Sequence, residues 1–238
     1  MKDWQIHWED AGAVLTGTRI LHPFRHRFSQ GMTYVVGNNG AGKSTLLKLL
    51  TGVVSPFEGD VHFTRRSSKG GREEIPAREV RRFLGYVPQV FTGYPQMRVE
   101  QYLRFVAIHH GLARCIISEV LESWFRHPTL AALRKKRMKG LSGGEQRKVG
   151  LVQALLHHPH ILILDEPFVG LDIEERLFFQ AHIQRIAHRG MVIMSTHQLE
   201  DISMEGTLCI LEEGNLIHQG FTKVKGTWLE DFFAASVK

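Results

Sequence analysis

The chain has 238 residues, two cysteines and a formal net charge of +6 at pH 7. This length allows one large domain, or a domain with a subdomain, around a buried core. Two isolated cysteines argue against a disulfide framework or a thiolate metal site, and they fit a reducing cytoplasm. The first ten residues are too polar for a secretory signal, and no apolar run approaches the roughly 18 residues that span a bilayer. We therefore expect any membrane role to come through a partner.

The positive charge is compatible with simple solubility, with nucleic acid or with a membrane-facing surface. Basic residues cluster at 65–72, 78–82 and 134–137. Aromatic residues do not alternate with them, as they do in surfaces that bind single-stranded nucleic acid. The sequence therefore does not favour nucleic acid as a partner.

Strand and helix patterns alternate from residue 32 onward, which predicts an α/β fold with a mainly parallel sheet. MTYVV at 32–36 has the composition of a buried strand. KSTLLKLLT at 43–51 has helical spacing, and Gly52 after it is a residue that commonly closes a helix. A short strand is expected at 60–63.

The middle of the chain changes from strand to helix patterns. The stretch 64–79 is polar, basic and glycine-containing, so we expect a surface loop, whereas FLGYV at 83–87 predicts a short buried strand. From about 95 to 138 apolar residues recur at helical spacing. This segment predicts a helical subdomain inserted in the sheet domain.

The last third of the chain returns to strands. ILIL at 161–164 and MVIMST at 191–196 are continuous apolar runs, typical of a sheet covered on both faces. The helix that begins at 143 is expected to end before Pro159. HHPH at 157–160 has no acidic or cysteine partner nearby, so we expect a solvated loop rather than a metal site. Gly214-Asn215 between two apolar runs predicts a hairpin.

GNNGAGKST at 37–45 follows a predicted strand and opens a helix, which is the context of a phosphate-binding loop. Glycines let backbone amides turn toward phosphates, and the helix N-terminus adds positive potential. Lys43 would place its charge on the β- and γ-phosphates, and Ser44 would ligate Mg²⁺. The predicted nucleotide-binding residues here are Gly37, Asn38, Asn39, Gly40, Ala41, Gly42, Lys43, Ser44 and Thr45.

Three other strands end in polar side chains. Asp165 and Glu166 follow one strand, Gln89 follows a second, and His197 follows a third. Each has an ordinary explanation alone, but parallel strands deliver them together to the edge where ligands bind in open α/β sheets. Asp165 would then hold Mg²⁺ directly or through water, and Gln89 would orient either the attacking water or the metal. Glu166 would polarise the attacking water, and His197 would hydrogen-bond the γ-phosphate.

LSGGEQRK at 141–148 contains an unusual helix start. Ser142 and Glu145 have capping-box spacing. Gly143 and Gly144 lie between them, although each glycine costs a helix roughly 1 kcal/mol against alanine. Bare amides at a helix N-terminus make a good anion site, and an ordinary capped helix is the alternative.

Together these motifs resemble those of the nucleotide-binding subunits of ATP-binding cassette (ABC) transporters. The segments that carry the resemblance are GNNGAGKST (Walker A), YVPQ at 86–89 (Q-loop), LSGGE at 141–145 (signature), ILILDEP at 161–167 (Walker B), GLD at 170–172 (D-loop, with Asp172) and STH at 195–197 (switch histidine). Their order and spacing match over essentially the whole chain. The signature motif is specific to this class, unlike the phosphate-binding loop.

The resemblance implies a P-loop NTPase (RecA-like) fold with an antiparallel β subdomain and an inserted α-helical subdomain. It implies one domain over 1–238, with the core and β subdomain at about 1–90 and 141–238 and the helical subdomain at about 91–140. It also implies an ATPase that uses ATP and Mg²⁺, pairs with an identical or related cassette, and lies on the cytoplasmic face of the cell membrane against a separate permease. The four signature residues Ser142, Gly143, Gly144 and Glu145 would contact the ATP of the partner cassette.

Three positions depart from the family pattern. The family places an adenine-stacking aromatic near Val14 or Leu15, so Leu15 would offer only apolar contact and base recognition is expected to be looser. Glu145 replaces the commoner glutamine, and Ile173 stands where many relatives carry proline. The catalytic positions are otherwise intact, which argues against a regulator that does not hydrolyse ATP.

Two segments indicate a branch of the family. YPQMRVEQYLRFVAIHHGL at 94–112 resembles a segment of bacterial drug, antibiotic and bacteriocin exporters, and LEDFFAASVK at 229–238 resembles their acidic-aromatic final helix. We therefore expect an exporter-type subunit. The alternative is a soluble ABC ATPase without a permease, acting in iron–sulfur assembly or on ribosomes or nucleic acid. Family members that act on ribosomes usually carry two cassettes in one chain, and those that maintain DNA carry long coiled-coil insertions. This sequence shows neither feature.

Overall fold

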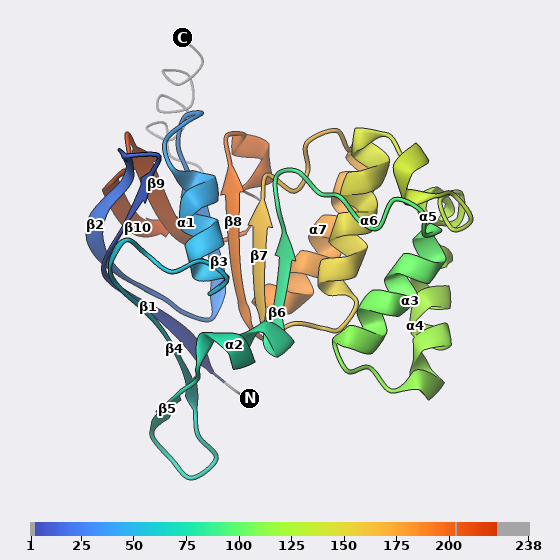
Figure 1. Cartoon of the computed structure of the whole chain (residues 1–238), viewed down its shortest axis with the longest axis horizontal. Coiled ribbons are helices and arrows are strands. Elements are labelled where there is room, and N and C mark those ends of the chain that lie inside the picture. The colour runs from blue at the N-terminus through green and yellow to red at the C-terminus, as the bar shows by residue number, and fades with distance from the viewer. Residues whose placement is uncertain (1–2, 203, 223–238) are drawn as a thin grey trace.

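The computed structural model describes residues 3–202 and 204–222, which form two β-sheets with flanking helices (Figure 1). The strands are β1 (Trp4–Leu15), β2 (Thr18–Phe28), β3 (Gly31–Val36), β4 (Glu58–Arg66), β5 (Arg72–Glu74), β6 (Leu84–Val87), β7 (Ile161–Asp165), β8 (Met191–Thr196), β9 (Gly206–Glu212) and β10 (Asn215–Thr222). The α-helices are α1 (Lys43–Leu50), α2 (Ala77–Val80), α3 (Val99–His109), α4 (Arg114–Phe125), α5 (Pro128–Ala131), α6 (Gly143–Leu155) and α7 (Ile173–Ala187). In the described part of the chain no helix is long and apolar enough to cross a bilayer.

The two sheets differ in their strand directions. The smaller sheet has the order β2-β1-β4-β5 and is antiparallel throughout. The larger sheet has the order β10-β9-β3-β8-β7-β6, in which only the β9–β10 pair is antiparallel. The predicted α/β fold, with a mainly parallel sheet and a separate antiparallel sheet, is therefore confirmed.

The antiparallel sheet begins with alternating side chains. Trp4, Ile6 and Trp8 are buried, while the residues between them are half-exposed, which is the pattern of a strand with one covered face. Thr16 and Gly17 have φ angles of 49° and 81°, as the two-residue turn of a tight hairpin requires. Neither β1 nor β2 is among the elements predicted from sequence, although the aromatic alternation was a visible signal.

The larger sheet separates two hydrophobic cores. Ile161 and Ile163 of β7 pack with α1 and the antiparallel sheet, whereas Leu162 and Leu164 pack with α6, α7 and the helices α3 and α4. All four side chains are fully buried, as expected for a strand covered on both faces. The two cores fix β7 between α1 and α6, and so fix the residues at the end of β7 against both helices.

Most of the elements predicted from residue 32 onward are confirmed. The strands at 32–36, 83–87, 161–164 and 191–196 correspond to β3, β6, β7 and β8, and the hairpin at Gly214-Asn215 joins β9 to β10. The first helix ends at Leu50, and Gly52 after it has a φ of 65°. The predicted helical stretch forms α3, α4 and α5, which lie together beside the sheet (Figure 1).

Two expectations are wrong in detail. The stretch 64–79 is not a loop throughout, because β4 continues to Arg66, pairs with β5 and is followed by α2, where Ile75 and Val80 are buried anchors. The 157–160 stretch is not wholly solvated either. The ring of His157 stacks on His110 with 3.7 Å between centroids, and Pro159 is buried. The segment 229–238 lies outside the described residues.

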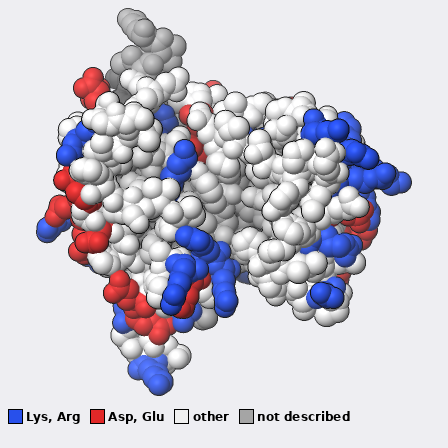
Figure 2. All heavy atoms as spheres, in the orientation of Figure 1, with Lys and Arg blue, Asp and Glu red and all other residues white. Residues whose placement is uncertain are grey.

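The basic clusters noted in the sequence lie apart in the fold. Arg78, Arg81 and Arg82 are exposed in and after α2, whereas Lys135 and its basic neighbours follow α5. On the face shown in Figure 2, basic side chains form separate groups rather than one continuous band. This face therefore has no single basic track.

Candidate functional site

The loop between β3 and α1 is shaped by glycines and closed by a lysine. Gly40 and Gly42 have φ angles of 84° and 97°, which glycine adopts without steric penalty. Lys43 is 6% exposed, and its Nζ donates to the carbonyl oxygens of Gly37 and Asn38 at 2.7 and 3.0 Å. Around it Asn39 and Gly40 are exposed, Ala41 is buried, and Ser44 and Thr45 are half-buried. The ammonium group is thus held across the loop by acceptors that a phosphate could replace.

Asp165 ends β7 with one carboxylate oxygen satisfied and one not. The Asp165 side chain is buried, and its Oδ1 accepts a hydrogen bond from Ser195 Oγ at 2.7 Å. Among the described residues, its Oδ2 has no hydrogen-bond partner. A buried carboxylate oxygen normally has a partner, and hard cations and their water ligands are partners that it binds well. The arrangement therefore fits a Mg²⁺ ion or a water bound to one.

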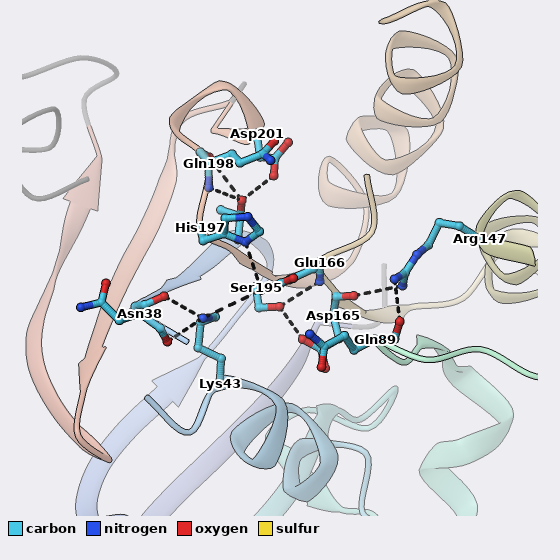
Figure 3. A network of polar contacts seen from close by, with 12 residues as sticks. Asn38, Lys43, Gln89, Arg147, Asp165, Glu166, Ser195, His197, Gln198 and Asp201 are labelled. Atoms are coloured by element: carbon cyan, nitrogen blue, oxygen red, sulfur yellow. Dashed lines mark hydrogen bonds and ion pairs between the residues drawn. The ribbon is translucent and has the colours of Figure 1, made fainter. Parts of the chain in front are cut away.

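Glu166 follows in a conformation that is unusual for its residue type. Its φ is 47°, a left-handed region that is strained for residues other than glycine and concentrated at functional sites. Its N–H donates to Ser195 Oγ at 3.0 Å. Its Oε1 lies 3.1 Å from His197 Nδ1 and 3.9 Å from Lys43 Nζ (Figure 3). The turn therefore aims the carboxylate toward both the lysine and the histidine.

The same cluster affects the lysine electrostatically. Burial lowers the pKa of Lys43, and the nearby carboxylates of Glu166 and Asp165 partly offset that effect. A buried ammonium between carboxylates is stabilised by their charge. An incoming polyanion would add to that stabilisation.

His197 lies on a loop that α7 holds in place. The loop leaves β8 at Thr196, whose Oγ1 accepts from the N–H of Gln198 at 2.9 Å and donates to the carboxylate of Asp201. Arg176 of α7 forms an ion pair with Asp201 and donates to Gln198 Oε1 at 3.0 Å. The His197 side chain itself is 42% exposed, so a ligand can reach it.

Gln89 follows β6 and is exposed, and its backbone is fixed by a buried arginine. Arg147 Nη2 donates to the Gln89 carbonyl oxygen at 2.6 Å, and Nη1 donates to the carbonyl oxygens of Pro88 and Asp165 at 2.9 and 3.3 Å. The backbone of Gln89 is thereby connected to the end of β7. Its side chain is exposed, so a ligand can reach it.

The signature stretch begins α6 with the predicted capping box. Ser142 Oγ accepts from the Glu145 N–H at 3.3 Å, and Glu145 Oε2 accepts from the Ser142 N–H at 2.9 Å. A Cβ on Gly144 would lie 2.7 Å from the Gly170 carbonyl oxygen, whereas a Cβ on Gly143 would meet nothing within 4 Å. Packing within the chain therefore explains the glycine at 144 but not the one at 143.

The structure brings some predicted residues together and leaves others apart. Lys43, Asp165, Glu166 and His197 form one cluster, to which Arg147 links Gln89. In residues 3–202 and 204–222, no hydrogen bond or ion pair joins the signature residues to the phosphate-binding loop. Asp172 caps α7 by accepting from the Glu175 N–H at 2.9 Å, and Leu15 is 63% exposed at the end of β1.

Sequence reasoning missed four residues that hold this cluster, which are Ser195, Arg147, Arg176 and Asp201. Ser195 had a signal, because it opens the STH tripeptide that ends in His197. The two arginines contact backbone or loop atoms 18 or more residues away in sequence, whereas Asp201 contacts Thr196 within its own loop. No local pattern marks such a contact.

The chain is similar to known proteins over most of its length. A family model described as ABC transporter matches residues 21–169, more than half of the chain. An uncharacterized ABC transporter ATP-binding protein, YhaQ of Bacillus subtilis, is 31% identical over 82% of this chain and 63% of its own length. Nod factor export ATP-binding protein I of Bradyrhizobium diazoefficiens is 32% identical over 78% of this chain and 60% of its own length. The chain thus spans less than two thirds of these curated relatives.

Solved structures share the fold. A structure described as the ATP binding subunit of an ABC transporter has a TM-score of 0.82 at 24% identity, covering 98% of this chain and 99% of the other. A bacterial Atm1-family ABC exporter with ATP bound has a TM-score of 0.76 at 21% identity, covering 98% of this chain and 41% of the other. These structures show the fold, whereas the family match and the relatives show that the chain belongs to the ABC transporter family and carries its ATP-binding ATPase domain.

Proposed function

We propose that this chain is the energy-coupling ATPase subunit of an exporter-type ABC transporter, working as a dimer with an identical or related cassette. The observation that carries the proposal is the cluster of Lys43, Glu166 and His197 beside the phosphate-binding loop. Export through a separate membrane permease is supported by the export named for the Nod factor relatives. We place the chain at the cytoplasmic face of the cell membrane, with no role for nucleic acid.

ATP binds along the loop from Gly37 to Thr45, with Leu15 against the base. Lys43 exchanges its contacts with the Gly37 and Asn38 carbonyls for phosphate oxygens. When bound, Mg²⁺ neutralises phosphate charge. The residues that would hold it are Ser44, Gln89 and Asp165, whose Oδ2 has no hydrogen-bond partner in the described part of the chain.

Hydrolysis follows from the placement of Glu166 and His197. Glu166 takes a proton from the attacking water, whose oxygen bonds to the γ-phosphorus while the bond from that phosphorus to the ADP oxygen breaks. His197 lies close enough to Glu166 for a hydrogen bond and donates to the γ-phosphate as charge develops there. The general base and the hydrogen-bond donor thus lie side by side, 3.1 Å apart.

The signature residues act on the other cassette's nucleotide. Ser142, Gly143, Gly144 and Glu145 start a helix whose N-terminal amides favour an anion. A Cβ on Gly143 would meet nothing within 4 Å. The ligand that needs this space would therefore come from another chain. The carbonyl of Gly170 packs on Gly144. Asp172 follows two residues later, so it would lie where the two cassettes meet.

The first test of this function is Glu166→Gln. The amide still accepts hydrogen bonds but takes no proton, so we expect ATP binding to persist and turnover to fall by about 10²- to 10⁴-fold. The variant should elute as a dimer on size exclusion with Mg²⁺ and ATP. Glu119→Gln, on the exposed face of α4, is the matched control and should behave as wild type. Normal turnover in Glu166→Gln would remove the general base from the mechanism.

The membrane role needs a separate experiment. Tagged Glu166→Gln is purified from membranes in mild detergent with ATP and Mg²⁺, and the proteins that copurify are identified. We expect a stoichiometric multi-spanning membrane protein. A purely soluble partner, or ribosomal or DNA-bound material, would move the chain to the branch of ABC ATPases that lack a permease.

A further inference from the structure

Arg147 is a buried arginine bound to backbone carbonyls. It is 8% exposed, and its guanidinium donates to the carbonyl oxygens of Pro88, Gln89 and Asp165 (Figure 3). Within the described residues it forms no ion pair with a carboxylate. Burial lowers the pKa of Arg147, and the charges of Asp165 and Glu166 partly offset that effect. Burying the charge of an arginine costs desolvation free energy, which its hydrogen bonds to these carbonyls must offset. An apolar side chain would avoid that cost but could not make these bonds.

The position of Arg147 on α6 ties it to the signature turn. Gly143 and Arg147 are four residues apart in one helix, so they lie on the same face about one turn from each other. Side chains in a helix lean toward its N-terminus, which directs Arg147 toward the signature end. The guanidinium and the first turn of α6 therefore lie at the same end of one helix.

The other end of this connection is the chain's own nucleotide site. Pro88 and Gln89 follow β6. Asp165 ends β7, and its own Oδ2 is the oxygen that has no hydrogen-bond partner among the described residues. A planar guanidinium presents its donors in a fixed fork and suits several acceptors at once. Arg147 thus spans the ends of two neighbouring strands, both of which would move toward bound Mg²⁺ and ATP.

We infer that Arg147 is a positioning residue that couples ATP binding at this chain's own P-loop to its signature turn, which contacts the partner's ATP. The inference rests on the proposed function, because it assumes two cassettes that share their nucleotides. When Gln89 and Asp165 engage the metal and phosphate, their backbones move Arg147, and α6 carries Gly143 into place. Each cassette then offers its signature only after it has bound its own ATP.

The test is ATP-driven dimerisation in the Glu166→Gln background. Arg147→Met and Arg147→Lys are compared with Glu166→Gln alone by sedimentation over a range of Mg²⁺-ATP concentrations. ATP affinity is measured separately by calorimetry at protein concentrations that keep the chain monomeric. We expect the affinity of the monomer to stay within about twofold, while half-maximal dimerisation requires about 5- to 150-fold more ATP, the usual range of coupling between sites.

Arg147→Lys separates geometry from charge. Lysine keeps the positive charge near Asp165 and Glu166, but one ammonium group does not reproduce the fork. If the hydrogen bonds matter, Arg147→Lys will need as much additional ATP for half-maximal dimerisation as Arg147→Met does. It also serves as the deciding variant if Arg147→Met does not fold. Wild-type dimerisation by Arg147→Lys would show that only the charge matters and would overturn the inference.

Arg134→Met is the matched control. Arg134 forms ion pairs with Glu100 and Glu122 within the helical segment, away from the nucleotide site. We expect it to reduce stability while leaving the ATP dependence of dimerisation unchanged. If Arg147→Met binds ATP more weakly as a monomer and Arg134→Met does not, Arg147 belongs to its own site and the coupling role is wrong. If Glu166→Gln alone never dimerises, the proposed function itself has failed.

Discussion

Ser195 supports both acidic residues of the site although it carries no charge. Its hydroxyl donates to Asp165 and accepts from the Glu166 N–H, and it is fully buried. Ser195→Ala leaves a buried carboxylate oxygen and a buried N–H unpaired. Each costs about 1–3 kcal/mol, so we expect the free energy of unfolding to fall by about 2–6 kcal/mol. ATP turnover should fall more than ATP affinity. Urea denaturation and steady-state ATPase assays measure the two effects.

The control for that substitution is Ser123→Ala. Ser123 is exposed on α4, and its hydroxyl donates only to a carbonyl of its own helix. Its stability should change by less than about 0.5 kcal/mol, as is usual for surface substitutions. Equal effects of the two substitutions would show that Ser195 has no special role in holding Asp165 and Glu166.

Single residues also show what sequence can and cannot predict. Glu166 was predictable because it directly follows an apolar strand, and Lys43 because its glycine-rich motif lies between such a strand and a helix, where this fold binds ligands. Leu15 was placed only by analogy, and its exposure leaves its contact with adenine a prediction. Arg147 was not predictable, because its three acceptors lie 59, 58 and 18 residues away in sequence. Its role depends on the folded chain.

At the scale of elements, α7 positions the loop that carries His197. Arg176 in its first turn pairs with Asp201, which is 5% exposed and also accepts from Thr196. Removing one partner of a buried ion pair costs about 3–5 kcal/mol. We expect Arg176→Met to lower the free energy of unfolding by about 3 kcal/mol and to reduce turnover, because His197 loses its fixed position. Denaturation and ATPase assays again provide the readouts.

Arg185→Met gives the comparison on the same helix. Arg185 is exposed, and we expect its loss to change stability by less than about 0.5 kcal/mol. A double-mutant cycle of Arg176→Met with Asp201→Asn then isolates the interaction energy of the pair. Additive effects in that cycle would mean that the ion pair does not hold the loop.

The elements that sequence missed share a physical cause. β1 and β2 pair across a tight turn and bury one face against α1, so their stability comes from packing, and the alternation of Trp4, Ile6 and Trp8 was the only signal noted for them in the sequence. The stretch 64–79 looks like a loop because its residues are polar, but pairing with β4 satisfies the backbone of β5. Polar edge strands have weak sequence signals. Buried strands such as β7 were predictable because both of their faces are covered.

At the scale of the molecule, one edge of the large sheet collects the residues of the chemistry, and side-chain contacts link the sheet to the helices beside it. Arg147 links α6 to the ends of β6 and β7 near the site. A second link lies elsewhere, where the rings of His110, at the end of α3, and His157, after α6, stack at 3.7 Å. This second contact is sensitive to pH, since both rings titrate when exposed to water.

The pH dependence follows from the two protonation states. Burial, with a smaller contribution from His110, lowers the pKa of His157 from 6.5 to about 3. Burial also lowers the pKa of His110. Between pH 6.5 and about 3, the unfolded chain binds a proton at His157 that the folded chain does not bind. The contribution of neutral His157 to the free energy of unfolding is therefore complete above pH 6.5 and is lost as the pH falls toward 3.

His157→Phe tests this argument because it keeps an aromatic ring but removes the titration. Between pH 6.5 and 5 the wild-type chain should lose about 2 kcal/mol of stability at this position, at about 1.4 kcal/mol for each unit. The loss between pH 8 and pH 5 should be smaller by that amount in His157→Phe, as measured by urea denaturation at both values. His109→Phe changes an exposed histidine next to His110 and should leave the loss unchanged. If His157→Phe loses as much stability as the wild type, the stacked pair is not what makes the fold sensitive to acid.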